Sequence, residues 1–263
     1  MNGLFSLPFT LQAPLATLFT WSVTALGAAL VVFTRKTRPT LMDAMLGFGA
    51  GVMLASSFWS LLAPSIEWAE QLQQLPWLVT CAGFLCGGSI LMVGDAILSR
   101  CLRRKDTTDT HRRCWMLITS ITLHNIPEGL AVGVAFGALT LTSSEAAILG
   151  AWMLAIGIGL QNFPEGAAVS LPLRREGASR GKAFFLGQLS GVVEPIAGVL
   201  GALLALTVQE VLPFMLSFAA GAMIAVVIAE LVPESQRNPR KNLMTLATLA
   251  GFTVMMLLDV ALG

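Results

Sequence analysis

Two short motifs place polar and ionisable side chains inside long apolar stretches of the chain. Residues 124–129 read His-Asn-Ile-Pro-Glu-Gly, and residues 161–166 read Gln-Asn-Phe-Pro-Glu-Gly. In each motif the first residue and the glutamate are four positions apart, so on a helix they share one face. Two copies of so specific a pattern predict one site built from both segments.

A third apolar stretch adds another carboxylate, Glu194, which is also followed by a proline. An ionisable group inside a bilayer is costly and usually functional. The candidate metal ligands are His124, Asn125, Glu128, Gln161, Asn162, Glu165 and Glu194.

The chemistry of this set favours a divalent cation. Three buried carboxylates would repel one another, and a divalent metal offsets that repulsion. Pro127, Pro164 and Pro195 each leave one helix carbonyl without its usual donor, which adds oxygens at the same depth. Imidazole with carboxylates suits Zn²⁺, Fe²⁺ or Mn²⁺, and the lack of nearby thiolates argues against Cu⁺.

The elements that must position these residues are membrane-spanning helices. The chain has 263 residues, of which 55% are apolar and only 12% are charged, whereas soluble proteins carry about 25% charged residues. We predict an all-α membrane protein with eight transmembrane helices. Their expected bounds are 11–33, 41–63, 77–98, 115–138, 146–171, 183–206, 212–232 and 243–262.

The charges orient these spans. All 16 Lys and Arg residues fall in four alternate connections, and the charged residues of the opposite connections are glutamates. Because cytoplasmic loops retain Lys and Arg, we expect both termini outside and residues 99–114 as a cytoplasmic loop. Residues 1–263 then form a single transmembrane domain, multi-pass in the cell (cytoplasmic or inner) membrane.

The same composition excludes two classes of partner. A net charge of +1 argues against nucleic acid, which attracts strongly basic proteins. The sequence has no phosphate-binding motif of the G-x-x-x-x-G-K-[ST] type, so ATP is not expected as a partner either.

The sequence contains two internal repeats. The central motifs are 37 positions apart, in neighbouring spans that run in opposite directions. More weakly, residues 47–61 match residues 217–231, with Gly51 opposite Gly221. These matches predict a 3+2+3 arrangement with inverted repeats, which is typical of transporters whose broken helices meet at mid-membrane.

With these motifs the chain resembles the ZIP (Zrt-, Irt-like) metal transporter family, and most closely its prokaryotic GufA-type branch. The resemblance implies uptake of zinc, with cadmium, iron or manganese as further substrates, through a midplane site on spans four, five and six. It also implies a binuclear metal site, an elevator-like or rocking movement of one helix bundle against another, and a homodimer.

The resemblance also assigns the ligands. It implies one metal held by His124, Glu128, Gln161 and Glu165, and a second held by Asn125, Asn162 and Glu194 together with the two bridging glutamates. Some relatives have a carboxylate where this chain has Asn162, so the second position should be weaker here.

Two other functions compete with a secondary metal transporter. A membrane-embedded metalloenzyme would need an activated water at an open metal position, and the H-E-x-x-H pattern is absent from the sequence. A proton-coupled carrier of an organic solute would use the glutamates for proton transfer, but the imidazole and the amide oxygens favour metal. We predict a transporter that is not an enzyme, with no prosthetic group and with the divalent metal ion and the lipid bilayer as its partners.

Further polar residues near the span ends could serve a path for the metal. Carboxylates at an inner span end could relay a released ion, and hydroxyls could line the outer half. The candidates for this path are Gln188, Glu230, Glu234, Ser57, Asp95 and His111.

Overall fold

The protein is a bundle of long helices. The computed structural model describes residues 7–33, 39–103, 109–140, 144–175, 177–207 and 209–262, and these residues contain helices and turns but no β-strand. Within these described ranges, seven helical stretches are long and apolar enough to cross a membrane. The prediction of an all-α membrane protein is therefore confirmed.

Most expected spans correspond to one helix or to two or three helices in line. The helices are α1 (Phe9–Phe33), α2 (Pro39–Ser56), α3 (Ala63–Gln71), α4 (Pro76–Arg103), α5 (Asp109–Ala138), α6 (Glu145–Arg175), α7 (Arg180–Leu189), α8 (Val193–Thr207), α9 (Leu212–Val226), α10 (Val232–Ser235) and α11 (Lys241–Leu262). The expected fourth span falls in α5, which is not among the seven, and the first side chains of α5 lie outside the described residues. The count of eight spans therefore stays a prediction.

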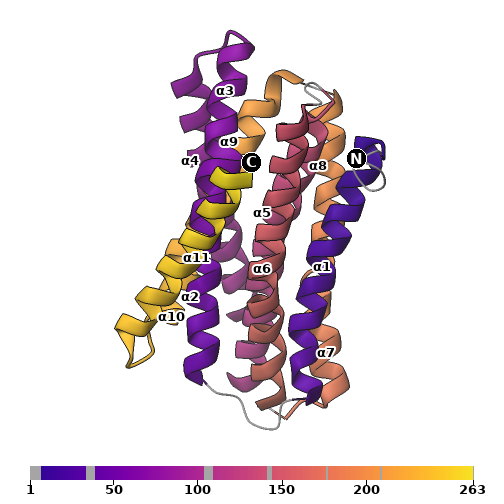
Figure 1. Ribbon diagram of the computed structural model, residues 1–263. Helices are drawn as coiled ribbons and strands as arrows, with labels where there is room; N and C mark the ends of the chain where they lie inside the picture. The colour runs from indigo at the N-terminus through magenta and orange to yellow at the C-terminus, as the bar shows by residue number, and fades with distance from the viewer. Residues whose placement is uncertain are drawn as a thin grey trace.

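The connection expected at 99–114 is largely helical in the structure. Helix α4 continues to Arg103 and α5 begins at Asp109, while residues 104–108 lie outside the described part of the chain. The first turn of α1 and the last turn of α11 lie at the same end of the bundle (Figure 1). This placement is what an even number of crossings requires.

The expected sixth span is broken in its middle. Helix α7 ends at Leu189, residues 190–192 form a turn, and α8 begins at Val193. In contrast, α5 and α6 run through Pro127 and Pro164 without interruption. A break within a membrane is tolerated only where the protein satisfies the freed backbone groups, so this turn marks a protein-lined interior beside Glu194.

The helices form two groups. Helices α1, α5, α6, α7 and α8 pack together and form the first bundle, while α2, α3, α4, α9, α10 and α11 form the second bundle. Figure 1 shows α1, α7 and α8 on one side of the molecule, with α4, α10 and α11 on the other.

Glycines bring backbones into contact inside each bundle. In the first bundle a Cβ on Gly166 would collide with the carbonyl of Thr24, and in the second a Cβ on Gly87 would collide with the carbonyl of Phe218. Small residues that let backbones approach are the usual means of joining helices in a membrane. Across the boundary between the bundles, a Cβ on Gly157 would meet only the flexible side chain of Met255. Each bundle is thus packed more closely within itself than against the other.

The helix contacts repeat in the same way as the weaker sequence match, which pairs residues 47–61 with residues 217–231. Gly51 of α2 faces the carbonyl of Thr248 in α11, and Gly221 of α9 faces the carbonyl of Phe84 in α4. Gly51 and Gly221 are the positions that the sequence match pairs, 170 residues apart. Matched glycines therefore make matched contacts in the two copies.

Each copy also contains one π-helical segment at the corresponding place. The segment η2 (Ser57–Leu62) follows α2, and η4 (Val227–Leu231) follows α9. Their first residues are again 170 positions apart. A π turn accommodates an extra residue and changes which face the following side chains present, and such turns are frequent at functional sites.

We expect Gly87→Ala to destabilise the second bundle by about 1–3 kcal/mol, because its methyl group would overlap the carbonyl of Phe218. The matched control is Gly94→Ala on the same helix, where a Cβ would meet nothing within 4 Å. The measurement is the melting temperature of the purified protein in detergent. Equal melting temperatures for the two variants would contradict the close contact between α4 and α9.

Candidate metal site

The structure gathers six of the seven predicted ligands. They lie on three helices of the first bundle: Asn125 and Glu128 on α5, Gln161, Asn162 and Glu165 on α6, and Glu194 on α8. All six are buried, and the largest exposed fraction is the 4% of Glu165. His124 belongs to α5, one turn before Glu128, but its side chain and that of His111 lie outside the described residues.

Hydrogen bonds from amide groups connect these helices. Gln161 Nε2 donates to Glu128 Oε1 at 2.6 Å and so joins α6 to α5. Asn125 Nδ2 donates at 2.9 Å to the carbonyl of Ser190, which belongs to the turn between α7 and α8. The break in the sixth span thus supplies the acceptor that fixes Asn125.

A second network reaches α1. Asn162 Nδ2 donates to Glu194 Oε2 at 2.8 Å and to the carbonyl of Thr20 at 3.2 Å. Thr24 Oγ1 donates to Glu194 Oε1 at 3.2 Å. Both Thr20 and Thr24 are fully buried in α1, so four helices of the first bundle contribute to the site.

The nitrogens of the site are partnered, but many of its oxygens are not. The amide nitrogens of Asn125, Gln161 and Asn162 all donate hydrogen bonds. Five oxygens, here called the acceptor cluster, are buried without any hydrogen-bond donor: Asn125 Oδ1, Glu128 Oε2, Gln161 Oε1, Asn162 Oδ1 and Glu165 Oε2. Buried polar atoms in native proteins are almost always satisfied. Five unsatisfied acceptors in one place therefore fit a bound cation.

The charges of the site also favour a cation. The carboxylates of Glu128, Glu165 and Glu194 lie close enough to interact electrostatically. All 16 basic residues of the chain lie outside the apolar stretches that carry the cluster. Unpaired charge in a low-dielectric interior is costly, and a divalent ion would relieve that cost.

The described carboxylates do not by themselves form a three-ligand metal group. Among the side chains that the structure describes, no three of the His, Cys, Asp and Glu types are placed to hold one ion. The amide oxygens of the cluster and the imidazole of His124 are the further protein donors that could contribute to a coordination sphere. This composition of nitrogen and oxygen donors suits zinc and its neighbours in the first transition row.

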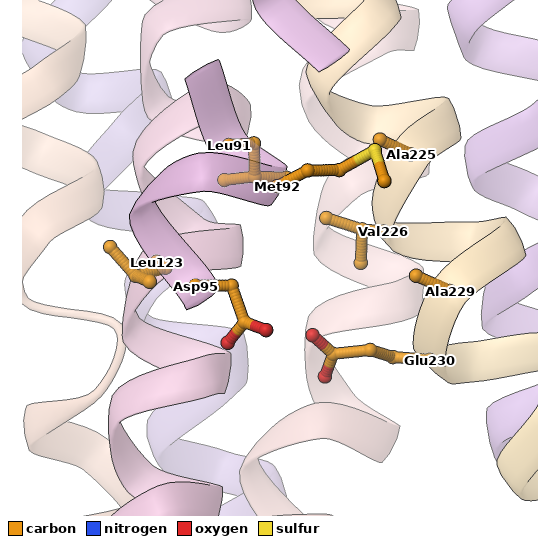
Figure 2. Close-up of a pocket in the computed structure, with 8 residues that line it drawn as sticks. All are labelled: Leu91, Met92, Asp95, Leu123, Ala225, Val226, Ala229 and Glu230. Atoms are coloured by element: carbon orange, nitrogen blue, oxygen red, sulfur yellow. The ribbon is translucent and has the colours of Figure 1, made fainter. Parts of the chain in front are cut away.

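Two of the predicted path residues face each other in a pocket beside α5. Asp95 of α4 and Glu230 of η4 point their carboxylates toward one another (Figure 2). The pocket has a volume of about 120 Å³ and reaches Leu123, the residue that precedes His124. Glu230 and Glu234 both line a neighbouring cavity of about 230 Å³. The carboxylate of Glu234 accepts a hydrogen bond from the Arg237 guanidinium at 2.5 Å.

Two other predicted path residues bond elsewhere. The Ser57 hydroxyl donates to the carbonyl of Met53 in its own helix at 2.7 Å. Gln188 is half-buried, and its carbonyl accepts from Trp21 Nε1 at 3.0 Å. No hydrogen bond among the described residues brings either side chain to the acceptor cluster.

A larger cavity opens at the end of the molecule where α1 begins and α11 ends. It has a volume of about 530 Å³, and Ser60, Glu67 and Asp259 line it. The Ser60 hydroxyl donates to Asp259 Oδ1 at 2.7 Å, while Asp259 Oδ2 is buried without a donor. Ser60 lies in η2, just as Glu230 lies in η4. Each π-helical segment therefore carries a polar residue that lines a cavity.

The threonines of α1 were not among the residues predicted from the sequence. Thr20 and Thr24 stand in an apolar span without a neighbouring charge, so they resemble ordinary packing residues. One signal could have found Thr24: it precedes Glu194 by 170 positions, the offset of the weaker repeat.

Comparison with known proteins gives consistent matches over nearly the whole chain. Residues 103–259 match the family model described as ZIP Zinc transporter. Zinc transporter ZIP11 of Xenopus tropicalis is 40% identical, over 96% of this chain and 98% of the relative. Zinc transporter ZIPB of Bordetella bronchiseptica is 35% identical, over 92% of this chain and 79% of the relative. Zinc transporter GufA of Myxococcus xanthus is 34% identical, over 94% of this chain and 98% of the relative.

We expect Glu165→Gln to have opposite effects with and without metal. The apo variant should melt at or above the temperature of the wild type, because one of the repelling carboxylates is gone. At a zinc concentration 100 times the dissociation constant, the wild type should gain about 2.7 kcal/mol, and the variant should lose most of that gain. Melting curves in detergent with and without zinc test this, with Glu145→Gln at the exposed start of the same helix as the control. Equal stabilisation of all three proteins by zinc would exclude Glu165 from the binding site.

Proposed function

The chain belongs to the ZIP zinc transporter family, and we propose that it carries zinc into the cytoplasm through the acceptor cluster. As a member of this family it is a divalent-metal transporter in a membrane and not an enzyme. Zinc is the expected substrate, and cadmium, iron and manganese are proposed as further ions because the same donor types suit them.

The observation that carries the proposal is the set of five unsatisfied acceptor oxygens. They belong to two neighbouring helices and are all buried. A neutral or anionic organic solute would need donors as well as acceptors from its site, whereas each amide nitrogen here already donates within the protein. A dehydrated metal ion needs acceptors only. This difference favours a metal over a neutral or anionic organic solute.

The proposed metal position uses Glu128, Gln161 and Glu165, with His124 as the nitrogen donor. Glu128 Oε1 is held by Gln161, so its second oxygen is fixed in direction. Fixed donors lose little conformational freedom when a ligand binds. The site is therefore preorganised for the ion that it takes up.

We propose a route through the two cavities. Zinc would enter from outside through the cavity lined by Glu67 and Asp259 and would leave toward the cytoplasm past Asp95 and Glu230. Acidic side chains at both openings attract a cation electrostatically. The orientation follows from the basic residues, which all lie in the connections expected on the cytoplasmic side.

Movement of the first bundle against the second would carry the ion across. The six described candidate ligands all belong to the first bundle, while Asp95, Glu230 and Asp259 belong to the second. Backbone contacts at glycines hold each bundle together, and Gly157 meets only a side-chain tip across the boundary. This packing supports an elevator-like or rocking displacement of two rigid units. A homodimer in the cell (inner) membrane is the form in which we expect the protein to act.

The test is uptake of radiolabelled zinc into proteoliposomes. Glu165→Ala should reduce the initial rate at least about tenfold, since a charged ligand is worth more than one such factor. The matched control is Glu145→Ala on the same helix, which should transport as the wild type does. Both variants must elute as monodisperse protein before reconstitution. Uptake by Glu165→Ala equal to that of the control would move the metal site away from the acceptor cluster.

A further inference from the structure

We propose that helix α1 positions Glu194 for the metal, with Thr24 holding its carboxylate and Trp21 holding the helix break that precedes it. Both are positioning residues, since they act on the ion through Glu194 and do not touch it. The inference rests on the proposed function of the acceptor cluster. It assigns a role in metal binding to α1, a helix that contains none of the predicted ligands.

The carboxylate of Glu194 can accept hydrogen bonds and bind a metal at the same time. Its Oε1 accepts from Thr24 Oγ1 at 3.2 Å, and its Oε2 accepts from Asn162 Nδ2 at 2.8 Å. An ionised carboxylate has about four lone-pair sites, so about two remain after these hydrogen bonds. The two donors therefore fix the direction of the lone pairs that are left, as hydrogen-bond partners behind metal ligands commonly do.

Packing holds the Thr24 side chain in its orientation. A Cβ on Gly191 would lie 3.0 Å from the methyl carbon of Thr24 and 3.1 Å from Glu194 Oε1, so the glycine makes room for both groups. The backbone of Thr24 meets α6, where a Cβ on Gly166 would collide with its carbonyl oxygen. A threonine in a helix has two main rotamers. The contact of its methyl group with Gly191 favours the rotamer that directs the hydroxyl to Glu194.

The carboxylate is the stronger of two acceptors near the Thr24 hydroxyl. The carbonyl of Thr20 lies 3.3 Å from the hydroxyl oxygen, but it also accepts from Asn162 Nδ2 at 3.2 Å. A carboxylate that binds a metal must be ionised, and a hydrogen bond to an ionised acceptor is about twice as strong as one between neutral groups. In the metal-bound protein the single proton of the hydroxyl therefore goes to Glu194.

The helix break before Glu194 leaves a carbonyl that needs a donor from another helix. In a regular helix the Glu194 N–H would bond to the carbonyl of Ser190, but here it donates to the carbonyl of Gly191 at 3.0 Å. The Ser190 carbonyl accepts from Asn125 Nδ2 instead, at 2.9 Å. The course of the backbone into Glu194 thus depends on side chains outside α8.

Trp21 supplies a hydrogen bond to the same break from α1. Its Nε1 donates at 3.0 Å to the carbonyl of Gln188, which also accepts from the Gly191 N–H within the turn at 3.2 Å. Trp21 and Thr24 are three positions apart on a helix, so they are neighbours on its surface. One face of α1 therefore holds both the backbone before Glu194 and the carboxylate itself.

The experiment measures the zinc affinity of the detergent-purified protein by equilibrium dialysis. Thr24→Val preserves the shape of the side chain and removes the donor, so it should weaken zinc binding about tenfold, as loss of a group behind a metal ligand does. Thr24→Ser keeps the donor and should bind within about threefold of the wild type. The matched control is Thr17→Val, because this buried hydroxyl donates to carbonyls of its own helix. Its zinc affinity should equal that of the wild type.

A second pair of variants tests the hold on the helix break. Trp21→Phe keeps an aromatic ring and removes the N–H group, so it should weaken zinc binding about threefold. The control is Trp77→Phe at the start of α4, where the side chain is exposed, and this variant should bind as the wild type does. Equal affinities for the two variants would contradict the role of Trp21.

A double-mutant cycle shows whether Thr24 acts through Glu194. Glu194→Ala removes the acceptor, so adding Thr24→Val to it should weaken binding by less than about twofold more. A further tenfold loss would show that Thr24 acts elsewhere and would overturn the inference. Equal losses in Thr24→Val and Thr24→Ser would overturn it as well, and this comparison decides alone if Glu194→Ala does not fold or bind.

Glu165→Ala separates this inference from the proposed function. Loss of binding in Glu165→Ala together with wild-type affinity in Thr24→Val would overturn the inference and leave the proposed function intact. Wild-type binding by Glu165→Ala would instead overturn the proposed function.

Discussion

The high cost of burying unpaired polar groups inside a bilayer is the constraint on which this structure depends. A lipid interior offers no water, so each buried donor and acceptor must find its partner within the protein or in a bound ion. In this molecule every amide nitrogen of the site is satisfied by the protein, whereas five acceptor oxygens are left. At the described residues of the site, the atoms left unsatisfied are thus of the kind that a metal ion binds.

Rigid surroundings are needed to maintain such an arrangement. Five acceptors would relax toward any available donor if the helices could shift, and the glycine contacts oppose that shift. The contact of Gly129 with Glu194 fixes α5 against α8, and the contact of Gly166 with Thr24 fixes α6 against α1. Both glycines belong to the motifs that carry the ligands. Each motif therefore supplies ligands together with the packing that holds them in place.

The sequence predicted the helical class and the residues that meet in the site because both depend on short-range patterns. A glutamate four positions after a polar residue must share its face, and two neighbouring spans with equal motifs bring those faces to the same depth. Partners that come from distant spans could not be predicted in this way. The Ser60–Asp259 and Thr24–Glu194 pairs are examples, since nothing local distinguishes these hydroxyls from packing residues.

Irregular backbone explains the remaining differences. From the sequence, the serines of the second span, Ser57 and Ser60 among them, were candidates for the outer path on residue type alone. In the structure η2 begins at Ser57, the side-chain directions change along the π turn, and Ser60 is the residue that lines the cavity. The turn at residues 190–192 was likewise not expected, because Ser-Gly within an apolar span also occurs in unbroken membrane helices.

The matched glycine contacts have a consequence for how the chain acquires its sense in the membrane. Because α2 packs on α11 much as α9 packs on α4, the inverted repeat gives the second bundle similar internal contacts when it is viewed from either side of the membrane. The interior of the second bundle therefore does little to determine the orientation of the chain in the membrane. That orientation depends on the 16 Lys and Arg residues of the four alternate connections. Moving these charges to the opposite connections would reverse the insertion of the same fold, and the proposed uptake would then become export.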